Sequence, residues 1–125
     1  MPGMRTLLTL LFLALVAVQA RALTVREYKA TMASADKSGI TLTRIYVGGL
    51  GEGIVAANVQ AERINKAPIF CQPQKLALGI DNFVNILDSI ITTISTKAPR
   101  EKVNEMSIVL LLLEGLQETF PCKGK

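Results

Sequence analysis

The chain has 125 residues, of which 50% are hydrophobic, and its 14 basic and 10 acidic side chains give a net charge of +4. It contains no histidine, which excludes Ser-His and Cys-His nucleophilic pairs and the common zinc sites. The basic residues are scattered, whereas nucleic-acid-binding proteins gather them on one face. We therefore predict a protein that is not an enzyme and that binds no metal, cofactor or nucleic acid.

The N-terminal segment has the pattern of a cleavable export signal. Arg5 precedes an apolar run from Leu7 to Val18, and small residues at cleavage spacing follow as Ala20 and Ala22. The apolar run has about 12 residues, which is too short for a membrane anchor, since a bilayer needs about 20. We predict cleavage after Ala22, with cleavage after Ala20 as the alternative.

Removal of residues 1–22 leaves residues 23–125, which we expect to form a single periplasmic domain without membrane contact. The longest later apolar run, Ile108 to Leu113, is too short to span a membrane. Two cysteines in an exported chain are usually paired. We therefore predict a disulfide between Cys71 and Cys122.

The first two predicted elements are helices separated by a short break. Thr24 can cap a helix over Val25 to Ala35, and the run Asp36-Lys37-Ser38-Gly39 should end it. A second helix is expected from Leu42 to Ile64, with Thr41 or Thr43 as its cap.

Glycines at positions 48, 49, 51 and 53 interrupt the second predicted helix. Each glycine costs about 1 kcal/mol relative to alanine, so we expect a kink or a compensating close contact. The spacing fits neither a dinucleotide-binding fingerprint nor a Walker loop. Gly49 and Gly53 stand four residues apart on one helix face, which predicts close approach of another helix, either within the chain or across a dimer.

After a loop from Asn65 to Lys75, a third helix is expected to end near Ala98, because Pro99 follows. Its polar face could be a solvated surface or a partner contact, and the candidate contacts on it are Asp81, Asn85 and Asp88. Its apolar stripe, with spacings of three and four, consists of Ile80, Phe83, Val84, Leu87, Ile90, Ile91 and Ile94.

A fourth helix is expected from Arg100 to Thr119, apolar in its middle and either buried all round or in contact with a partner. Two helices of about 20 residues are each about 30 Å long and, joined by a short turn, lie antiparallel. This arrangement brings Cys122 near Cys71. The predicted fold is an all-α bundle of about four helices, with an antiparallel C-terminal hairpin clamped by one disulfide.

The turn between the third and fourth helices is charged and would lie opposite the disulfide. Loops held on rigid scaffolds often carry function, although a plain solvated turn is the alternative. The candidate partner contacts in this turn are Lys97, Pro99, Arg100 and Lys102.

The C-terminal half also resembles a known family. Ile69-Phe70-Cys71-Gln72-Pro73, the amphipathic helix, the turn at Pro99, the apolar helix and Glu118-Thr119-Phe120-Pro121-Cys122 resemble the Tai family of type VI secretion amidase immunity proteins and the related Rap-type proteins. Upstream, Tyr46-Val47-Gly48-Gly49-Leu50-Gly51-Glu52-Gly53 resembles the tyrosine- and glycine-bearing helix of that family. The resemblance covers residues 46–122.

This resemblance implies a periplasmic, all-helical and often dimeric protein that binds a papain-like peptidoglycan amidase and blocks its active-site groove. The contact residues of the family do not carry over to this sequence. The matching residues, which the resemblance implies to be structural, are Phe70, Cys71, Pro73, Phe120, Pro121 and Cys122.

Two other functions are compatible with the sequence. A periplasmic acid-stress chaperone of the HdeA-like type is also small, helical and bridged by one disulfide. A domain of this fold could also serve a purpose unrelated to immunity, since a fold does not determine a function.

Overall fold

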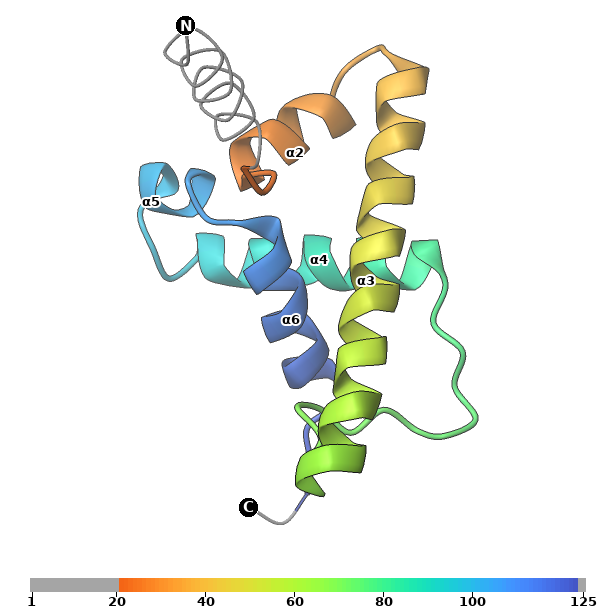
Figure 1. The fold of residues 1–125 in the computed structure, drawn as a ribbon. Coiled ribbons are helices and arrows are strands. Elements are labelled where there is room, and N and C mark those ends of the chain that lie inside the picture. Colours follow the sequence, from red (N-terminus) through yellow and green to blue (C-terminus); the bar gives the residue numbers. More distant parts are fainter. Residues whose placement is uncertain (1–20, 124–125) are drawn as a thin grey trace, which may run out of the picture.

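The computed structural model describes residues 21–123, so nearly all of the predicted signal peptide lies outside the described residues. Its helices are α2 (Val25–Met32), α3 (Lys37–Asn65), α4 (Ile80–Ser95), α5 (Arg100–Asn104) and α6 (Ile108–Thr119). The described part of the chain forms no strand beyond one isolated antiparallel bridge between Thr24 and Ser107. The predicted all-α fold is confirmed (Figure 1).

The start of α2 is fixed by a reciprocal cap. The Thr24 hydroxyl accepts a hydrogen bond from the backbone N–H of Glu27, and the Glu27 carboxylate accepts one from the Thr24 N–H at 2.8 Å. Thr24 is thus the predicted cap, although α2 ends at Met32 instead of Ala35.

The predicted break at residues 36–39 and the predicted helix start at Leu42 are both wrong, because α2 already ends at Met32 and α3 begins at Lys37. The Asp36 side chain accepts a hydrogen bond from the Ser38 N–H at 3.0 Å and so caps α3. A capping aspartate satisfies a backbone donor that has no partner inside the helix. The same residues that resemble a helix breaker therefore act as a helix start.

The glycine run does not break α3, which is continuous over 29 residues. A Cβ atom on Gly48 would lie 2.7 Å from Ile80, and one on Gly51 would lie closer still to the ring of Phe83. These two glycines therefore let the side chains of Ile80 and Phe83 on α4 lie against the backbone of α3, which is the compensating close contact that the sequence predicts.

Gly49 and Gly53 are different, since a Cβ atom on either would meet nothing within 4 Å. The alternative in which these two residues pack against a helix of the same chain is therefore wrong. The alternative of a contact across a dimer stays a prediction.

The apolar stripe of α4 forms the centre of the core, as predicted for five of its seven residues. Phe83, Val84, Leu87, Ile90 and Ile91 are buried, whereas Ile80 is 40% exposed and Ile94 is only partly buried. α6 packs against them with Ile108, Leu111, Leu112 and Leu116, all of which have an exposed fraction of 0%.

The predicted single helix over residues 100–119 is wrong, because it divides into α5 and α6. In the break, the Val25 N–H donates to the Met106 carbonyl at 2.9 Å, and the Ile108 N–H donates to the Leu23 carbonyl at 3.0 Å. Ser107 caps α6 by accepting a hydrogen bond from the Val109 N–H. The segment before α2 thus supplies the backbone partners that replace those of a continuous helix.

The predicted disulfide is present, with 4.9 Å between the Cα atoms of Cys71 and Cys122. It does not join the ends of two equal helices, because α4 has 16 residues, α6 has 12, and α4 starts only at Ile80. In Figure 1, α4 crosses α3 and α6 instead of running along them. The disulfide instead ties the end of α6 to the connecting segment that precedes α4.

That connecting segment is held against α3 by one buried polar side chain. Asn58, 6% exposed, accepts hydrogen bonds from the N–H groups of Ile69 and Phe70 and donates to the Phe70 carbonyl at 2.9 Å. The Cys71 N–H donates to the Phe120 carbonyl at 2.8 Å. The segment therefore bridges α3 and the end of α6.

The two glycine environments give a matched test of this packing. The variant Gly51→Ala should be destabilised by about 1–3 kcal/mol, because its methyl group must displace the buried Phe83 ring. Gly53→Ala should instead be more stable than the parent by up to about 1 kcal/mol through helix propensity alone. Urea unfolding followed by circular dichroism measures both, and equal effects would contradict the described α3–α4 contact.

Loss of the disulfide should lower the free energy of unfolding by about 4 kcal/mol in the chain-entropy account, because the bond closes a loop with a sequence separation of 51. The double variant Cys71→Ser/Cys122→Ser, compared with the oxidised parent in urea, measures this loss. An unchanged unfolding midpoint would show that the hydrogen bonds around Asn58 hold the segment without the bond.

Candidate partner-binding surfaces

The described residues contain no group of three or more His, Cys, Asp or Glu side chains placed to hold a metal ion. Among the helices of residues 21–123, none is long and apolar enough to cross a membrane. Three surfaces are considered as partner-binding sites: the tip (residues 97–102), the polar stripe (Asp81, Asn85 and Asp88) and the outward side of α3.

The tip presents charged side chains from the turn that follows α4 and from the first residues of α5, instead of from the plain loop that the sequence predicts. Lys97, Pro99, Arg100 and Lys102 are all exposed, as predicted for contact residues. The basic residues among them take part in neither of the two ion pairs that the described residues form. Their charges are therefore available to a partner.

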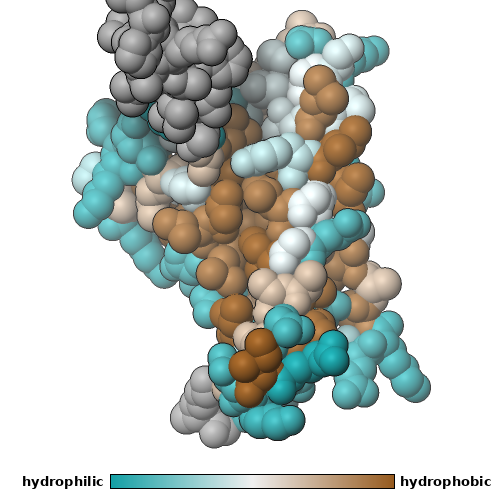
Figure 2. Space-filling model, viewed as in Figure 1, coloured by the Kyte–Doolittle hydropathy of each residue, from teal (hydrophilic) through white to brown (hydrophobic). Residues whose placement is uncertain are grey.

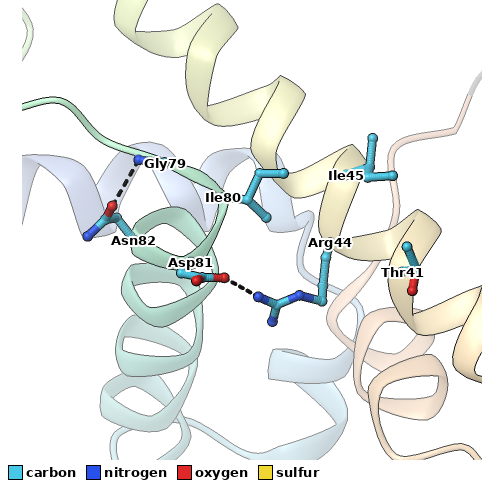
Figure 3. Close-up of a pocket in the computed structure, with 7 residues that line it drawn as sticks. All are labelled: Thr41, Arg44, Ile45, Gly79, Ile80, Asp81 and Asn82. Carbon is cyan, nitrogen blue, oxygen red and sulfur yellow. Dashed lines mark hydrogen bonds and ion pairs between the residues drawn. The ribbon is translucent and has the colours of Figure 1, made fainter.

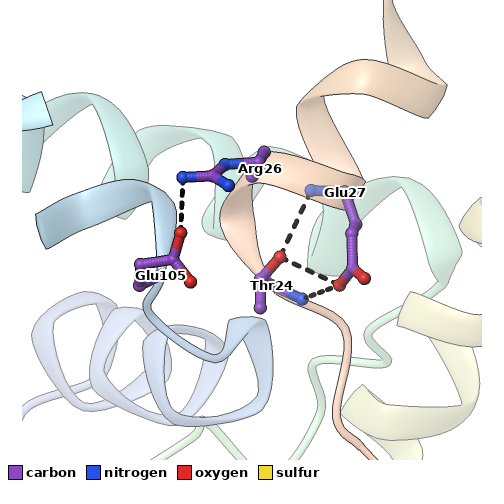
Figure 4. Close-up of polar contacts among 4 residues, drawn as sticks. All are labelled: Thr24, Arg26, Glu27 and Glu105. Carbon is purple, nitrogen blue, oxygen red and sulfur yellow. Dashed lines mark hydrogen bonds and ion pairs between the residues drawn. The ribbon is translucent and has the colours of Figure 1, made fainter. Parts of the chain in front are cut away.

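The backbone under the tip is fixed at both ends. At the end of α4, the N–H groups of Lys97 and Ala98 donate to the Ile94 carbonyl, and Val103 of α5 is 2% exposed in the core. At the other end of α5, Glu105 forms an ion pair with Arg26 at 2.5 Å (Figure 4). Both side chains of this pair are exposed, so it adds little stability, but it joins α5 to α2.

Next to that ion pair, the cap of α2 also changes the acidity of a carboxyl group. The hydrogen bonds from the Thr24 N–H and hydroxyl hold the pKa of Glu27 below its ordinary value (Figure 4). Glu27 therefore stays ionised, and the cap intact, in mildly acidic solution.

The polar stripe is largely occupied by contacts within the chain. The Tyr28 hydroxyl donates a hydrogen bond to Asp88 at 2.7 Å, and the Arg44 guanidinium forms an ion pair with Asp81. Asn85 is exposed between them. The structure thus gives two of the three predicted contact residues a role in holding α2 and α3 to α4.

A shallow groove of about 480 Å³ lies beside the Arg44–Asp81 pair, between the first half of α3 and the start of α4. Figure 3 shows Arg44 reaching from α3 across the groove to Asp81, while the Asn82 side chain accepts a hydrogen bond from the Gly79 N–H. Its charged groups are already paired with each other. The groove therefore offers no free charge to a ligand.

The outward side of α3 carries exposed apolar side chains along its first half, where Leu42 and Tyr46 line a shallow pocket together with Arg21 and Leu23. Leu42 is 67% exposed, Ile45 55% and Tyr46 41%, and no atom lies within 4 Å of a Cβ position on Gly49 or Gly53. We call this surface the α3 face, and it consists of Leu42, Ile45, Tyr46, Gly49, Gly53 and Ala56.

Further exposed apolar surface lies on α6. Figure 2 shows brown, hydrophobic side chains gathered over α3 and α6 on the viewed side of the molecule. On α6, Leu110 is 67% exposed and Leu113 is partly buried. Sequence reasoning assigned Leu42 and Ile45 to the helix but did not separate its outward side from its buried side.

Comparison with known proteins adds no assignment to these surfaces. No family model matches the chain, and neither a curated protein nor a solved structure matches it. The surfaces are therefore interpreted on their geometry and chemistry.

The Tyr28–Asp88 contact gives a pH-dependent prediction. Burial, followed by the hydrogen bond to Asp88, raises the pKa of Tyr28 above its ordinary value. Because the unfolded side chain ionises near pH 10 and the folded one does not, stability from this group is complete below about pH 10 and falls above it. Tyr28→Phe should lose about 1 kcal/mol at pH 7 and should decline less between pH 9 and 11 than the parent.

Urea unfolding at each pH measures this difference. Tyr46→Phe is the matched control, because Tyr46 lies on the exposed α3 face and makes no hydrogen bond through its hydroxyl to a described residue. Parallel pH profiles for the parent and Tyr28→Phe would contradict the assignment.

Proposed function

We propose that this protein is a periplasmic immunity protein that binds a papain-like peptidoglycan amidase of type VI secretion and blocks its active-site groove by steric occlusion. The observation that carries the proposal is the disulfide between Cys71 and Cys122, which joins the two halves of the motif on which the family resemblance rests.

The structural environment of the motif supports this proposal. Phe70 is 1% exposed, Phe120 packs against the core, and the Cys71 N–H bonds to the Phe120 carbonyl. These residues hold α3 and α6 together. Because both cysteines are paired, the described residues contain no free thiol. Such a scaffold suits a protein that inhibits an enzyme by steric occlusion and that needs no catalytic residues of its own.

The contact with the amidase is assigned to the tip. A blocking element must enter a cleft without collapsing, and the tip consists of a turn and the start of α5, whose backbone is fixed by Ala98 and Val103. In Figure 1, α5 lies far from the C-terminal end of the chain, where the disulfide ties the scaffold. The exposed Lys97, Arg100 and Lys102 would contact acidic groups at the rim of the cleft.

Export before folding is part of the proposal. The Leu23 carbonyl accepts a hydrogen bond from the Ile108 N–H, whereas no described backbone bond outside a helix involves Arg21 or Ala22. Cleavage after Ala22 would therefore leave every such bond in place. Mass spectrometry of the exported protein, with Leu23 as the expected first residue, tests this site.

Charge reversal at the tip should abolish most of the inhibition. The variant Lys97→Glu/Arg100→Glu should raise the inhibition constant against the cognate amidase at least tenfold, because two contact charges become repulsive. Titration of amidase activity on purified peptidoglycan measures this constant.

The matched control is Arg63→Glu/Lys75→Glu, which reverses two exposed charges outside the tip. It should inhibit as the parent does. Equal inhibition by both double variants would remove the tip from the interface, and a parent protein that inhibits no amidase encoded beside it would overturn the proposed function.

The exposed apolar side chains of the α3 face favour the chaperone alternative, because a holdase binds unfolded clients through exposed apolar surface. The two functions separate in one assay. Suppression of client aggregation at low pH, with release on neutralisation and no effect on an amidase, would favour the chaperone.

A further inference from the structure

We infer that a groove between the second half of α3 and the connecting segment binds an extended segment of a partner protein with a basic side chain at each end. The groove consists of two adjoining hollows of about 380 Å³ and about 210 Å³, which share Val55 and Gln72 as lining residues. Figure 1 shows the connecting segment looping past this half of α3. The inference goes beyond the proposed function, because it assigns a second binding site.

The groove is acidic at both ends, although the chain has a net charge of +4. Glu62 lines the larger hollow and Glu52 the smaller one, and both are exposed. Neither takes part in the two ion pairs that the described residues form, and none of the residues that line the two hollows is basic. The two carboxylates therefore attract a basic ligand and repel an acidic one.

The spacing of the two carboxylates fits an extended peptide. Glu62 follows Glu52 by ten positions in α3, which places their Cα atoms about 15 Å apart along the helix axis. In an extended chain, residues four positions apart are separated by about 13 Å and point to the same side. Two arginines at that spacing can reach both carboxylates, and the residue midway between them then faces the floor of the groove.

The floor between the carboxylates is apolar. Val59 is 49% exposed, while the buried Phe70 lines the larger hollow and the buried Phe83 lines the smaller one. An apolar side chain placed between two basic ones would remove this surface from water. A ligand that is cationic along its whole length would not.

Unpaired polar groups of the connecting segment favour a peptide over a simple diamine. The Gln72 Nε2 group donates to the Leu76 carbonyl, but Gln72 Oε1 is buried without a hydrogen-bond partner among the described residues. Such an acceptor is unfavourable until a donor reaches it, and a peptide N–H can do so after a small rotation of Gln72. No hydrogen bond between described residues uses the backbone N–H of Gln74, which also lines the groove and can donate to a peptide carbonyl.

The groove and the tip are separate surfaces. Cys71 lines the larger hollow, so the groove lies at the end of the molecule that the disulfide ties. In Figure 1, α5 lies far from that end. Substitutions in the groove should therefore leave the inhibition that we assign to the tip unchanged.

The binding test uses the acetylated and amidated peptide Arg-Thr-Val-Thr-Arg with the exported, disulfide-bonded protein. Isothermal titration calorimetry at low salt, where surface charges are least screened, gives the dissociation constant. We expect this peptide to bind at least tenfold more tightly than Arg-Arg-Thr-Thr-Val, which has the same charge with adjacent arginines. It should also bind more tightly than a linear twelve-carbon diamine, which has two cationic ends and no amide groups.

The variant Glu52→Gln/Glu62→Gln should bind the peptide at least tenfold more weakly than the parent, because both carboxylates become neutral. The matched control Glu101→Gln/Glu114→Gln removes the same charge from exposed positions on α5 and α6 and should bind as the parent does. Unchanged far-ultraviolet spectra show that both double variants keep the fold.

A second pair of variants tests the position of the peptide. Val59→Lys places a cation inside the groove and should abolish binding, whereas Ile64→Lys adds the same charge to α3 outside the groove and should leave binding in place. Both residues are exposed in the parent, so neither substitution disturbs the core.

Four outcomes would overturn the inference: a parent that binds no peptide, equal binding of the two peptides, equal binding of the diamine, or equal losses in a variant and its matched control. Self-association of the parent that disappears in Glu52→Gln/Glu62→Gln would also overturn it, because the occupant would then be the basic tip of another copy. A protein that binds the peptide as described and inhibits no amidase would refute the proposed function and leave this site standing.

Discussion

The crossing of α3 over α4 at Gly48 and Gly51 is the contact on which the rest of the fold depends. Without side chains at these positions, Ile80 and Phe83 of α4 lie against the backbone of α3, and Phe83 is 1% exposed. The other side of α4 is thereby available to α6, where Gly115 meets Ile86 and Ile90 in the same manner. α4 is the central layer because glycines on both neighbours let it approach closely.

The crossing also explains why the disulfide is placed where it is. Because α4 crosses α3 near the middle of α3, the second half of α3 extends beyond the core and would lack a packing partner there. The connecting segment fills that role, with Asn58 satisfying the backbone groups of Ile69 and Phe70 that burial would otherwise leave unpaired. The disulfide then fastens this segment to α6, so that one covalent bond and one buried amide stabilise the same end of the molecule.

Much of this arrangement could be predicted from the sequence, and the failures have physical causes. The stripe of α4 was predictable from its helical spacing, and the pairing of Cys71 with Cys122 was predictable because the chain has only two cysteines. The start of α3 was not, because Asp36 can end one helix or cap the next, and only tertiary packing decides between them. The break after Asn104 was missed for a related reason, since it depends on backbone bonds from Leu23 and Val25, residues far away in the sequence.

The candidate surfaces also include features that could be predicted from the sequence and features that could not. Exposure of the tip was predictable, because a proline-containing turn between two helices lies at a surface. The roles of Asp81 and Asp88 were not, since a charged stripe has the same sequence pattern whether it meets solvent, a partner, or Arg44 and Tyr28 from other helices. The outward side of α3 could not be identified from the sequence either. Glycine is neither clearly apolar nor polar, so the pattern of side chains did not show that Gly48 faces the core while Gly49 faces outward.

The two pairs of glycines on α3 differ in whether a contact offsets their cost in helix stability. Each glycine in a helix costs about 1 kcal/mol relative to alanine, and at Gly48 and Gly51 the burial of Ile80 and Phe83 offsets this loss inside the chain. At Gly49 and Gly53 no atom of the described chain lies near enough to do so, and the large residues beside them are exposed to water. Glycines on two opposite faces of α3 thus allow a neighbour to approach closely. Within the described chain, only Gly48 and Gly51 of these four have such a neighbour.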